Sequence, residues 1–202
     1  MQIITIIVGY LETNCYLLVS PNKDTLIIDP GAEASKILSV IDQNQLKPVM
    51  MVLTHLHPDH VEAALTIKEK WPIPLCYSQD EEQLIKMAPR FWQSISAPMA
   101  DRFIKENDVL SFGEEAIKVI ATPGHSAGGL SFYDGNGHLF SGDTLFNSGI
   151  GRWDLPTGSK EALGDSINKK LFALPDAVIV YPGHGPTTTI AAEKKRRGKL
   201  FE

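Results

Sequence analysis

The chain alternates between short apolar runs of strand length and longer segments whose apolar positions recur at helical spacing. Strand-like runs occupy residues 2–8, 14–19, 25–29, 48–54, 74–77, 116–121, 129–133, 138–141 and 177–181. Helical periodicity falls near residues 33–45, 61–71, 80–93, 98–105, 159–173 and 188–197. Short turns join the early strands, which favours antiparallel pairing, and the interspersed helices have apolar faces that can cover a sheet. The pattern predicts a mixed α/β domain.

Metal-binding side chains are densest directly after the apolar run at 48–54, in the six residues from His55 to His60. Alternate side chains of an extended segment share a face, so His55 and His57 project the same way and can bind one ion. The chain then turns, which carries Asp59 and His60 to a neighbouring position where they can hold a second ion. The spacing suits a two-metal site at the end of a strand.

Three later motifs each place one further ligand type just past a strand. They contain His125 in Thr-Pro-Gly-His-Ser, Asp143 in Ser-Gly-Asp-Thr, and His184 in Pro-Gly-His-Gly. A neighbouring glycine lets the backbone turn tightly in each. A lone histidine is more often a hydrogen-bonded structural residue than a ligand, but the four motifs together favour metal binding. The remaining histidine, His138, lies in a Gly-Asn-Gly-His turn and is interpreted as a solvated hairpin residue.

Together with Thr13–Leu18 and the turn at Ile27–Gly31, these motifs resemble those of the metallo-β-lactamase-fold hydrolases, most of all the small glyoxalase II-type thioesterases. The resemblance spans nearly the whole chain. It implies a four-layer αββα sandwich and two divalent metal ions, zinc first, with iron or manganese as alternatives. It also implies which side chains bind them: His55, His57 and His125 for the first ion, Asp59, His60 and His184 for the second, and Asp143 as a bridge.

This ligand set suits hydrolysis. Metal coordination lowers the pKa of water from about 15.7 to roughly 7, so a hydroxide nucleophile is available near neutral pH. Asp59, as a ligand facing that water, is the candidate catalytic residue that orients it and accepts its proton. A thiolate leaves readily because a thiol has a pKa of about 8.5. We therefore expect a thioesterase acting on S-lactoylglutathione or a related acyl-thiol.

A glycine-rich loop at residues 147–159 follows Asp143 and is the best candidate for substrate contact. By the resemblance, Arg152 matches a basic residue near the thiol cofactor, where a guanidinium binds a carboxylate bidentately. Arg152 and Trp153 are the expected substrate-binding residues. Alternatively, Arg152 pairs with Asp154 and braces the loop. Residues 80–105 form either a helical flap over the metals or part of the core.

Two features depart from the family pattern. Val61-Glu62-Ala63 stands where many relatives have a glycine pair, so the start of the following helix must fit larger side chains. Only residues 185–202 follow His184, whereas full-length glyoxalase II carries a helical C-terminal extension that helps to bind glutathione. Residues 1–202 are therefore expected to form a single domain without that extension, and glutathione specificity stays open.

The composition argues against some classes of binding partner. The chain has 19 Lys and Arg against 24 Asp and Glu, a net charge of −5, and has no basic stripe that would favour nucleic acid. No apolar run approaches the roughly 20 residues of a membrane helix, and the amino terminus lacks a basic leader. The two cysteines lie in apolar contexts typical of buried free thiols. We expect a cytoplasmic enzyme with a small-molecule substrate; oligomeric state is not predicted.

Three other functions are compatible with the motifs. A persulfide dioxygenase of the same fold would hold a single iron through His55, His125 and Asp143, and would consume oxygen. A lactonase or other small-ester hydrolase would differ in its substrate panel. A non-catalytic scaffold stabilised by metal would bind without turnover.

Overall fold

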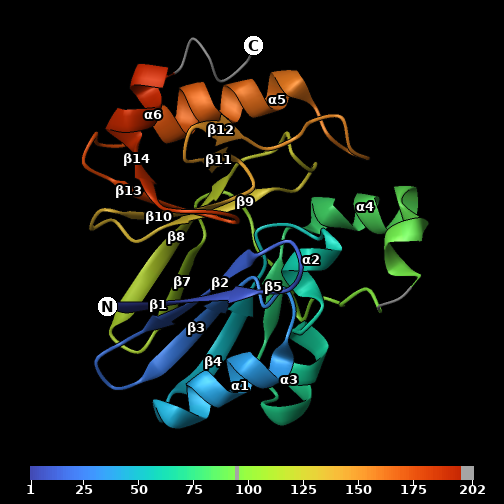
Figure 1. Cartoon of the computed structure of the whole chain (residues 1–202), viewed down its shortest axis with the longest axis vertical. Coiled ribbons are helices and arrows are strands. Elements are labelled where there is room, and N and C mark those ends of the chain that lie inside the picture. The colour runs from blue at the N-terminus through green and yellow to red at the C-terminus, as the bar shows by residue number, and fades with distance from the viewer. Residues whose placement is uncertain (94–95, 197–202) are drawn as a thin grey trace.

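The computed structural model describes residues 1–93 and 96–196, in which two six-stranded sheets pack face to face between outer helices (Figure 1). The first sheet has the order β1-β2-β3-β4-β5-β6. Its strands are β1 (Gln2–Val8), β2 (Thr13–Val19), β3 (Asp24–Ile28), β4 (Lys47–Val52), β5 (Leu75–Tyr77) and β6 (Arg102–Phe103). The first three strands are antiparallel, as their short turns predicted, and the pairs from β3 to β6 are parallel.

The second sheet has the order β14-β13-β10-β9-β8-β7. Its strands are β7 (Val109–Phe112), β8 (Glu115–Ala121), β9 (Leu130–Tyr133), β10 (His138–Gly142), β13 (Ile179–Pro182) and β14 (Thr188–Thr189). Only the pair β10–β13 is parallel. A small hairpin, β11 (Leu145–Phe146) and β12 (Gly149–Ile150), stands apart from both sheets.

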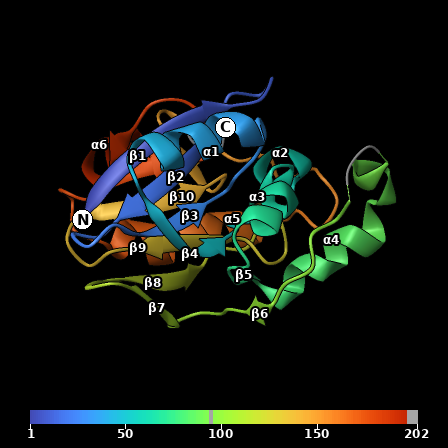
Figure 2. The same ribbon diagram turned by 90° about the horizontal axis from the view of Figure 1, so that it is seen from below.

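Helices cover the outer face of each sheet. Against the first sheet lie α1 (Ala34–Gln43) and α3 (Ala64–Lys70), and against the second lie α5 (Lys160–Asp165) and α6 (Ile190–Arg196) (Figure 1). A π-helical turn η3 (Ser166–Lys170) and a 3-10 turn η4 (Leu171–Ala173) continue α5. The segment η1 (Gln79–Glu81), α4 (Glu82–Met87) and η2 (Pro89–Trp92) stands to one side of the sandwich, as Figure 2 shows from below.

Alternating side chains explain why the sheets lie between helices. In β2, Leu17 faces α1 and α3, whereas Leu18 faces the second sheet. Three apolar layers result, one under the helices of the first sheet, one between the sheets, and one under α5 and α6. Full burial of a large side chain contributes about 1.5–3 kcal/mol, so the layers hold the four-layer arrangement together. The αββα sandwich is thereby confirmed.

Several sequence predictions of local structure were wrong. Residues 98–105 are not helical, because β6 pairs with β5 and the Asp101 carboxylate accepts a hydrogen bond from Leu75 N (2.8 Å). The helix expected at 80–93 is broken before Pro89 into short turns. The strand β7 and the hairpin β11–β12 were not predicted. The predicted helix at 188–197 begins as β14, and residue 197 lies outside the described residues.

Both cysteines are buried free thiols, and burial raises the pKa of Cys76 to about 11. Within residues 1–93 and 96–196, the structure holds no helix long and apolar enough to span a bilayer.

Candidate metal centre

The seven predicted ligands converge at one end of the sandwich. His55 and His57 follow β4, His125 follows β8, Asp143 follows β10 and His184 follows β13. Asp59 and His60 lie on a one-turn helix, α2 (Pro58–Val61), directly after His57. Strands that run in the same direction place their carboxyl ends at a common edge, which is why segments so distant in sequence meet there.

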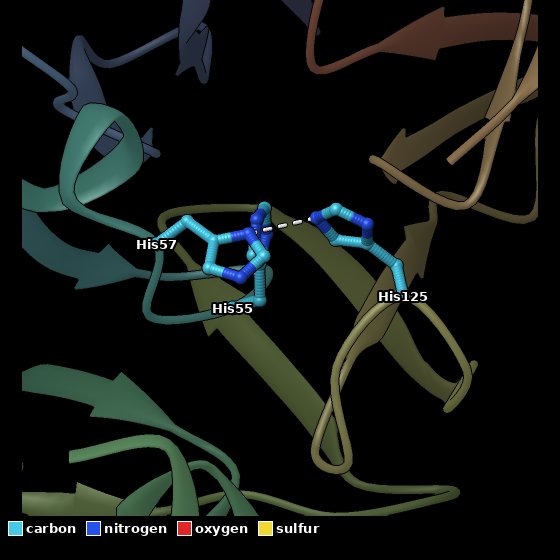
Figure 3. Close-up of side chains that lie close together, drawn as sticks. All are labelled: His55, His57 and His125. Atoms are coloured by element: carbon cyan, nitrogen blue, oxygen red, sulfur yellow. Dashed lines mark hydrogen bonds between the residues drawn. The ribbon is translucent and has the colours of Figure 1, made fainter. Parts of the chain in front are cut away.

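The first group consists of His55, His57 and His125, all buried (Figure 3). One ligand atom from each lies within 4.8 Å of the others. His125 Nε2 is 2.8 Å from His57 Nδ1, and the rings meet edge to face with interplanar angles of 82–88°. Three imidazoles from two different loops thus point toward one position.

The second group consists of Asp59, His60 and His184. His184 Nε2 lies 3.2 Å from Asp59 Oδ2 and 3.3 Å from His60 Nε2. The turn at Pro58 places Asp59 and His60 beside the first group, as the sequence predicted.

Asp143 lies between the two groups. Its Oδ2 is 3.5 Å from both His125 Nε2 and His184 Nε2, and its Oδ1 is 3.4 Å from His60 Nε2. Gly183 leaves room for this carboxylate, because a Cβ there would overlap Asp143 Oδ1 and come within 2.8 Å of His60 Cε1. The position of Asp143 suits a bridge.

In four of these five histidines, Nδ1 makes a hydrogen bond to a group outside the centre, which leaves Nε2 facing the centre. The partners of Nδ1 are Thr54 Oγ1 for His55 (2.9 Å), Asp29 Oδ2 for His60 (2.9 Å), Arg152 O for His125 (2.7 Å) and Leu11 O for His184 (2.9 Å). His57 is the exception, since its Nδ1 faces His125. These contacts fix the ring orientations before any ion binds.

Asp29 is a supporting residue that the sequence analysis missed. Its buried carboxylate accepts hydrogen bonds from Thr54 N (2.7 Å), Thr54 Oγ1 (2.6 Å) and His60 Nδ1. The carboxylate therefore joins the end of β3 to both metal groups. The available signal was a charged residue directly after the fully apolar run Leu26–Ile28.

The electrostatics separate neutral donors from ionised ones. Burial and the neighbouring imidazoles lower the pKa of His55 well below its ordinary value and that of His57 to about 3, so both offer lone pairs at neutral pH. Burial alone would raise the pKa of Asp143, but His60 and His184 outweigh it and hold that pKa well below its usual range. Against burial, hydrogen bonds to Asp143 and Asp59 raise the pKa of His184 to about 10. The carboxylates thus make this end strongly attractive to cations.

The residues fit divalent metal ions. Among the described residues, His55 Nε2, His57 Nε2 and Asp143 Oδ1 are buried atoms without a hydrogen-bond partner. Such atoms are uncommon in folded proteins, and a bound ion would satisfy them. Imidazole and carboxylate donors suit zinc, iron or manganese. The structure therefore holds a candidate site for two metals.

A cavity of about 430 Å³ opens above this centre. Apart from ligands and Pro58, its lining is mostly apolar: Leu11, Phe91, Phe146, Ile150 and Leu155. Phe91 packs edge-on to His57, with ring centroids 5.6 Å apart. The segment with α4 and η2 therefore contributes both to the pocket and to the core under the first sheet.

The two expected substrate contacts have different surroundings. Arg152 lines the cavity, but its Nε and a terminal nitrogen each donate to a carboxylate oxygen of Asp154 at 3.0 Å. Trp153 packs on the core under α5, with Lys160 Nζ 5.0 Å from its ring centroid, and is not part of the cavity lining.

His138 lies outside the centre and its Nδ1 donates to Asp134 (2.6 Å). Ile150 and Leu155, which also line the cavity, belong to the loop at 147–159 that the sequence singled out for substrate contact. Sequence reasoning missed Leu11 and Phe146 as lining, because a scattered apolar residue carries no chemical signal.

Comparison with known sequences identifies the family to which this site belongs. A profile of the Metallo-beta-lactamase superfamily matches residues 8–184. The "Probable metallo-hydrolase YqgX" of Bacillus subtilis is 38% identical over 194 residues, covering 93% of this chain and 92% of that protein. The "Hydroxyacylglutathione hydrolase GloC" of Haemophilus influenzae is 34% identical over 203 residues, covering 96% of each.

Comparison with solved structures supports the same family. The BLEG-1 B3 metallo-beta-lactamase matches with a TM-score of 0.89 at 34% identity, over 96% of this chain and 97% of that one. TTHA1623 in a di-iron-bound form matches with a TM-score of 0.85 at 35% identity, over 95% and 97%. The chain therefore belongs to the metallo-β-lactamase superfamily and is a metal-dependent hydrolase of that family.

Proposed function

We propose that the chain hydrolyses a thioester with the help of two divalent metal ions. The observation that carries this proposal is the convergence of seven ligand side chains beneath an apolar cavity of about 430 Å³. The 34% identical relative named a hydroxyacylglutathione hydrolase supports the reaction type. All these side chains and the cavity lining lie between Leu11 and His184.

The ligand roles follow the observed grouping. His55, His57 and His125 would hold the first ion, Asp59, His60 and His184 would hold the second, and Asp143 would be shared between them. When bound, such a pair of ions lowers the pKa of water and polarises a carbonyl oxygen. We take zinc as the first choice; iron stands beside it because a relative of known structure is di-iron-bound.

Asp59 is the proposed catalytic carboxylate. Its Oδ2 accepts a hydrogen bond from Thr13 Oγ1 (3.1 Å), which fixes the orientation of the carboxylate. Although burial opposes it, His60 and His184 keep the pKa of Asp59 well below its ordinary value, so the group is ionised and can accept a hydrogen bond from water. Asp59 thereby orients the attacking water and receives its proton.

The cavity favours an acyl group that is largely apolar. Phe91, Phe146 and Leu155 offer carbon surface, and among the described residues Arg152 is the one arginine or lysine of the lining. A thiolate departs without a proton, because its conjugate acid has a pKa of about 8.5. We therefore propose a small acyl-thiol as substrate, with Arg152 as the contact for a carboxylate on it. Contact with Trp153 and a cytoplasmic location stay predictions.

The test combines metal analysis with a substrate panel. Purified protein is loaded separately with zinc, iron(II) and manganese, and its metal content is measured before each assay. We expect hydrolysis of S-lactoylglutathione or of short acyl thioesters at two ions per chain, and at least tenfold slower turnover of matched oxygen esters. Oxygen consumption on glutathione persulfide by a single-iron form would instead establish the dioxygenase. A fully loaded sample that cleaves no thioester would refute the proposal.

The Arg152 contact is tested separately. Arg152→Met keeps much of the side-chain length and removes the charge. We expect a higher KM for thioesters with a carboxylate on the thiol part and an unchanged KM for uncharged ones. Equal changes for both classes would contradict a charge-specific contact.

A further inference from the structure

Glu81 is a buried carboxylate that the ligand set does not include. It ends the 3-10 turn η1, and its residue is only 1% exposed. A buried charge is costly unless it is hydrogen-bonded, so its partners indicate what it does.

Those partners are backbone amides of two different ligand loops. Glu81 Oε2 accepts from Leu56 N at 2.7 Å, and Oε1 accepts from Gly128 N at 2.8 Å. Leu56 lies between His55 and His57, and Gly128 lies three residues after His125. One carboxylate thus spans the loops that carry all three members of the first group.

The backbone amide of Leu56 is well placed to fix the two histidines beside it. Its side chain is fully buried in the core under α1 and α3, whereas the neighbouring imidazoles of His55 and His57 point to the centre. A hydrogen bond at this amide therefore fixes the backbone between two ligands. A backbone bond from Leu130 N to Thr54 O (2.8 Å) joins the same loops beside His55.

The approach of Glu81 to the second loop depends on a glycine. A Cβ at Gly128 would lie 2.6 Å from Glu81 N and 2.9 Å from Glu81 Cγ. Ser78 holds the turn in place, because its Oγ accepts from Asp80 N and its carbonyl accepts from Glu81 N (3.0 Å). The carboxylate is therefore presented from a fixed turn.

We propose that Glu81 is a positioning residue that sets the separation of His55 and His57 from His125, and thereby the affinity of the first metal site. Residues that support metal ligands from outside typically change affinity by about 10–100-fold when altered. The second group differs, because Asp59, His60 and His184 make no contact with Glu81 in the hydrogen bonds and ion pairs of the described residues. The proposal depends on the metal centre and not on the identity of the substrate.

The test is Glu81→Gln, measured in two backgrounds. The amide keeps the shape but has one acceptor oxygen, so only one of the two backbone amides can remain bonded. We expect the remaining ion to occupy the first group in His184→Ala and the second group in His125→Ala, because each variant removes one ligand from the other group. We expect Glu81→Gln to weaken zinc binding about tenfold or more in the first background and less than threefold in the second, by competition with a chelating dye.

The matched control is Asp80→Asn, which removes a carboxylate from the exposed neighbouring position. It should change zinc affinity less than threefold in both backgrounds. The visible spectrum of the cobalt-substituted His184→Ala protein should also change with Glu81→Gln and not with Asp80→Asn, because it reports the ligand geometry. A lower melting temperature alone would not produce either result.

An unchanged affinity in the His184→Ala background would overturn the proposal, and so would an equal loss in both backgrounds. If Glu81→Gln does not fold, Glu81→Asp is measured in the same way. The shorter aspartate keeps the charge but cannot reach both amides, so the same selective loss is expected, and its absence would overturn the proposal.

Discussion

At the scale of single residues, the centre is organised by what lies behind the ligands. Thr54, Asp29 and the carbonyls of Arg152 and Leu11 each occupy an Nδ1 atom. A histidine held in this way presents one nitrogen in one direction, which removes the entropy cost of choosing a ring orientation upon binding.

Asp143 should be required by both ions. We expect Asp143→Ala to reduce the metal content from two ions per chain to fewer than one, because it removes the carboxylate between the groups and one of the negative charges that offset the ions. Elemental analysis after gel filtration measures this. The exposed carboxylate variant Asp42→Ala serves as control and should keep two ions. Full occupancy of both sites in Asp143→Ala would refute the bridging role.

The candidate ligands stood out in the sequence, whereas the residues that support them did not. His55, His57 and Asp59 stand out because such residues seldom cluster after an apolar strand. Asp29 and Glu81 are single carboxylates whose partners lie 25 or more residues away and include three backbone amides. A backbone amide is present at every position but proline, so no residue pattern marks it as a partner.

At the scale of elements, loops after strands hold the site and helices hold the loops. The loop with His125 packs on α5: Ser159 N donates to Gly124 O (2.8 Å), and Ser166 Oγ donates to Pro123 O (2.7 Å). Ser159 also caps α5 by accepting from Ala162 N (3.2 Å). The helix therefore positions a ligand although it carries none.

Gly124→Ala should disrupt this contact. Gly124 has φ +135, and a Cβ there would overlap the backbone of Leu163 in α5. We expect a loss of at least about 3 kcal/mol, from backbone strain and overpacking together. Gly135→Ala is the matched control, because its φ is +75 but no atom lies within 4 Å of the added Cβ. It should cost about 1–2 kcal/mol in urea unfolding. Equal losses would show that packing on α5 contributes nothing.

The β9–β10 hairpin should show a pH-dependent contribution. Burial would raise the pKa of Asp134, but hydrogen bonds from His138 N, His138 Nδ1 and Asn136 N outweigh it and lower that pKa below the ordinary 3.8. A lowered folded-state pKa stabilises above pH 3.8, and this stabilisation is lost as the pH falls toward the folded value.

Asp134→Asn isolates the charge. At pH 7 it should reduce the free energy of unfolding by about 1 kcal/mol, and the difference from the parent should shrink toward zero below pH 3.8. Urea unfolding at several pH values measures both chains. A difference that grows as the pH falls would contradict the assigned direction.

At the scale of the whole molecule, the centre exists only because two sheets pack together. His55 and His57 follow a strand of the first sheet, and His125, Asp143 and His184 follow strands of the second. The large side chains between the sheets, including Phe132 and Phe140, fix how these two sets of loops face each other. Metal binding and global folding should therefore be coupled.

Removal of metal should lower the melting temperature of the entire chain. A ligand that binds only the folded state stabilises it by about 4 kcal/mol at a thousandfold excess over Kd. We expect a strong chelator to lower the melting temperature and excess zinc to restore it. Asp143→Ala should show little response to the chelator. An unchanged parent transition after verified metal loss would mean that the apo fold needs no ion.

The layered fold was predictable from sequence to a limited degree. Periodicity indicated a mixed α/β domain, and only the family resemblance indicated four layers. Among the strands that were missed, β6, β7 and β14 are short, and each lies at a sheet edge, where one neighbour is absent. The helix predicted at 80–93 was too long because it ignored Pro89, which cannot continue the helix before it, so α4 ends at Met87.

The hydrogen bond from His125 to the carbonyl of Arg152 links two properties of the site, the retention of metal and the shape of the cavity. Arg152 lines the cavity, and its carbonyl also accepts the hydrogen bond that orients the His125 imidazole in the first group. Exchanging residues 147–159 for a relative's loop would therefore alter metal retention together with substrate preference, unless the carbonyl stays in place. Selection for a new substrate would have to act on the side chains of this loop while it conserves the path of its backbone.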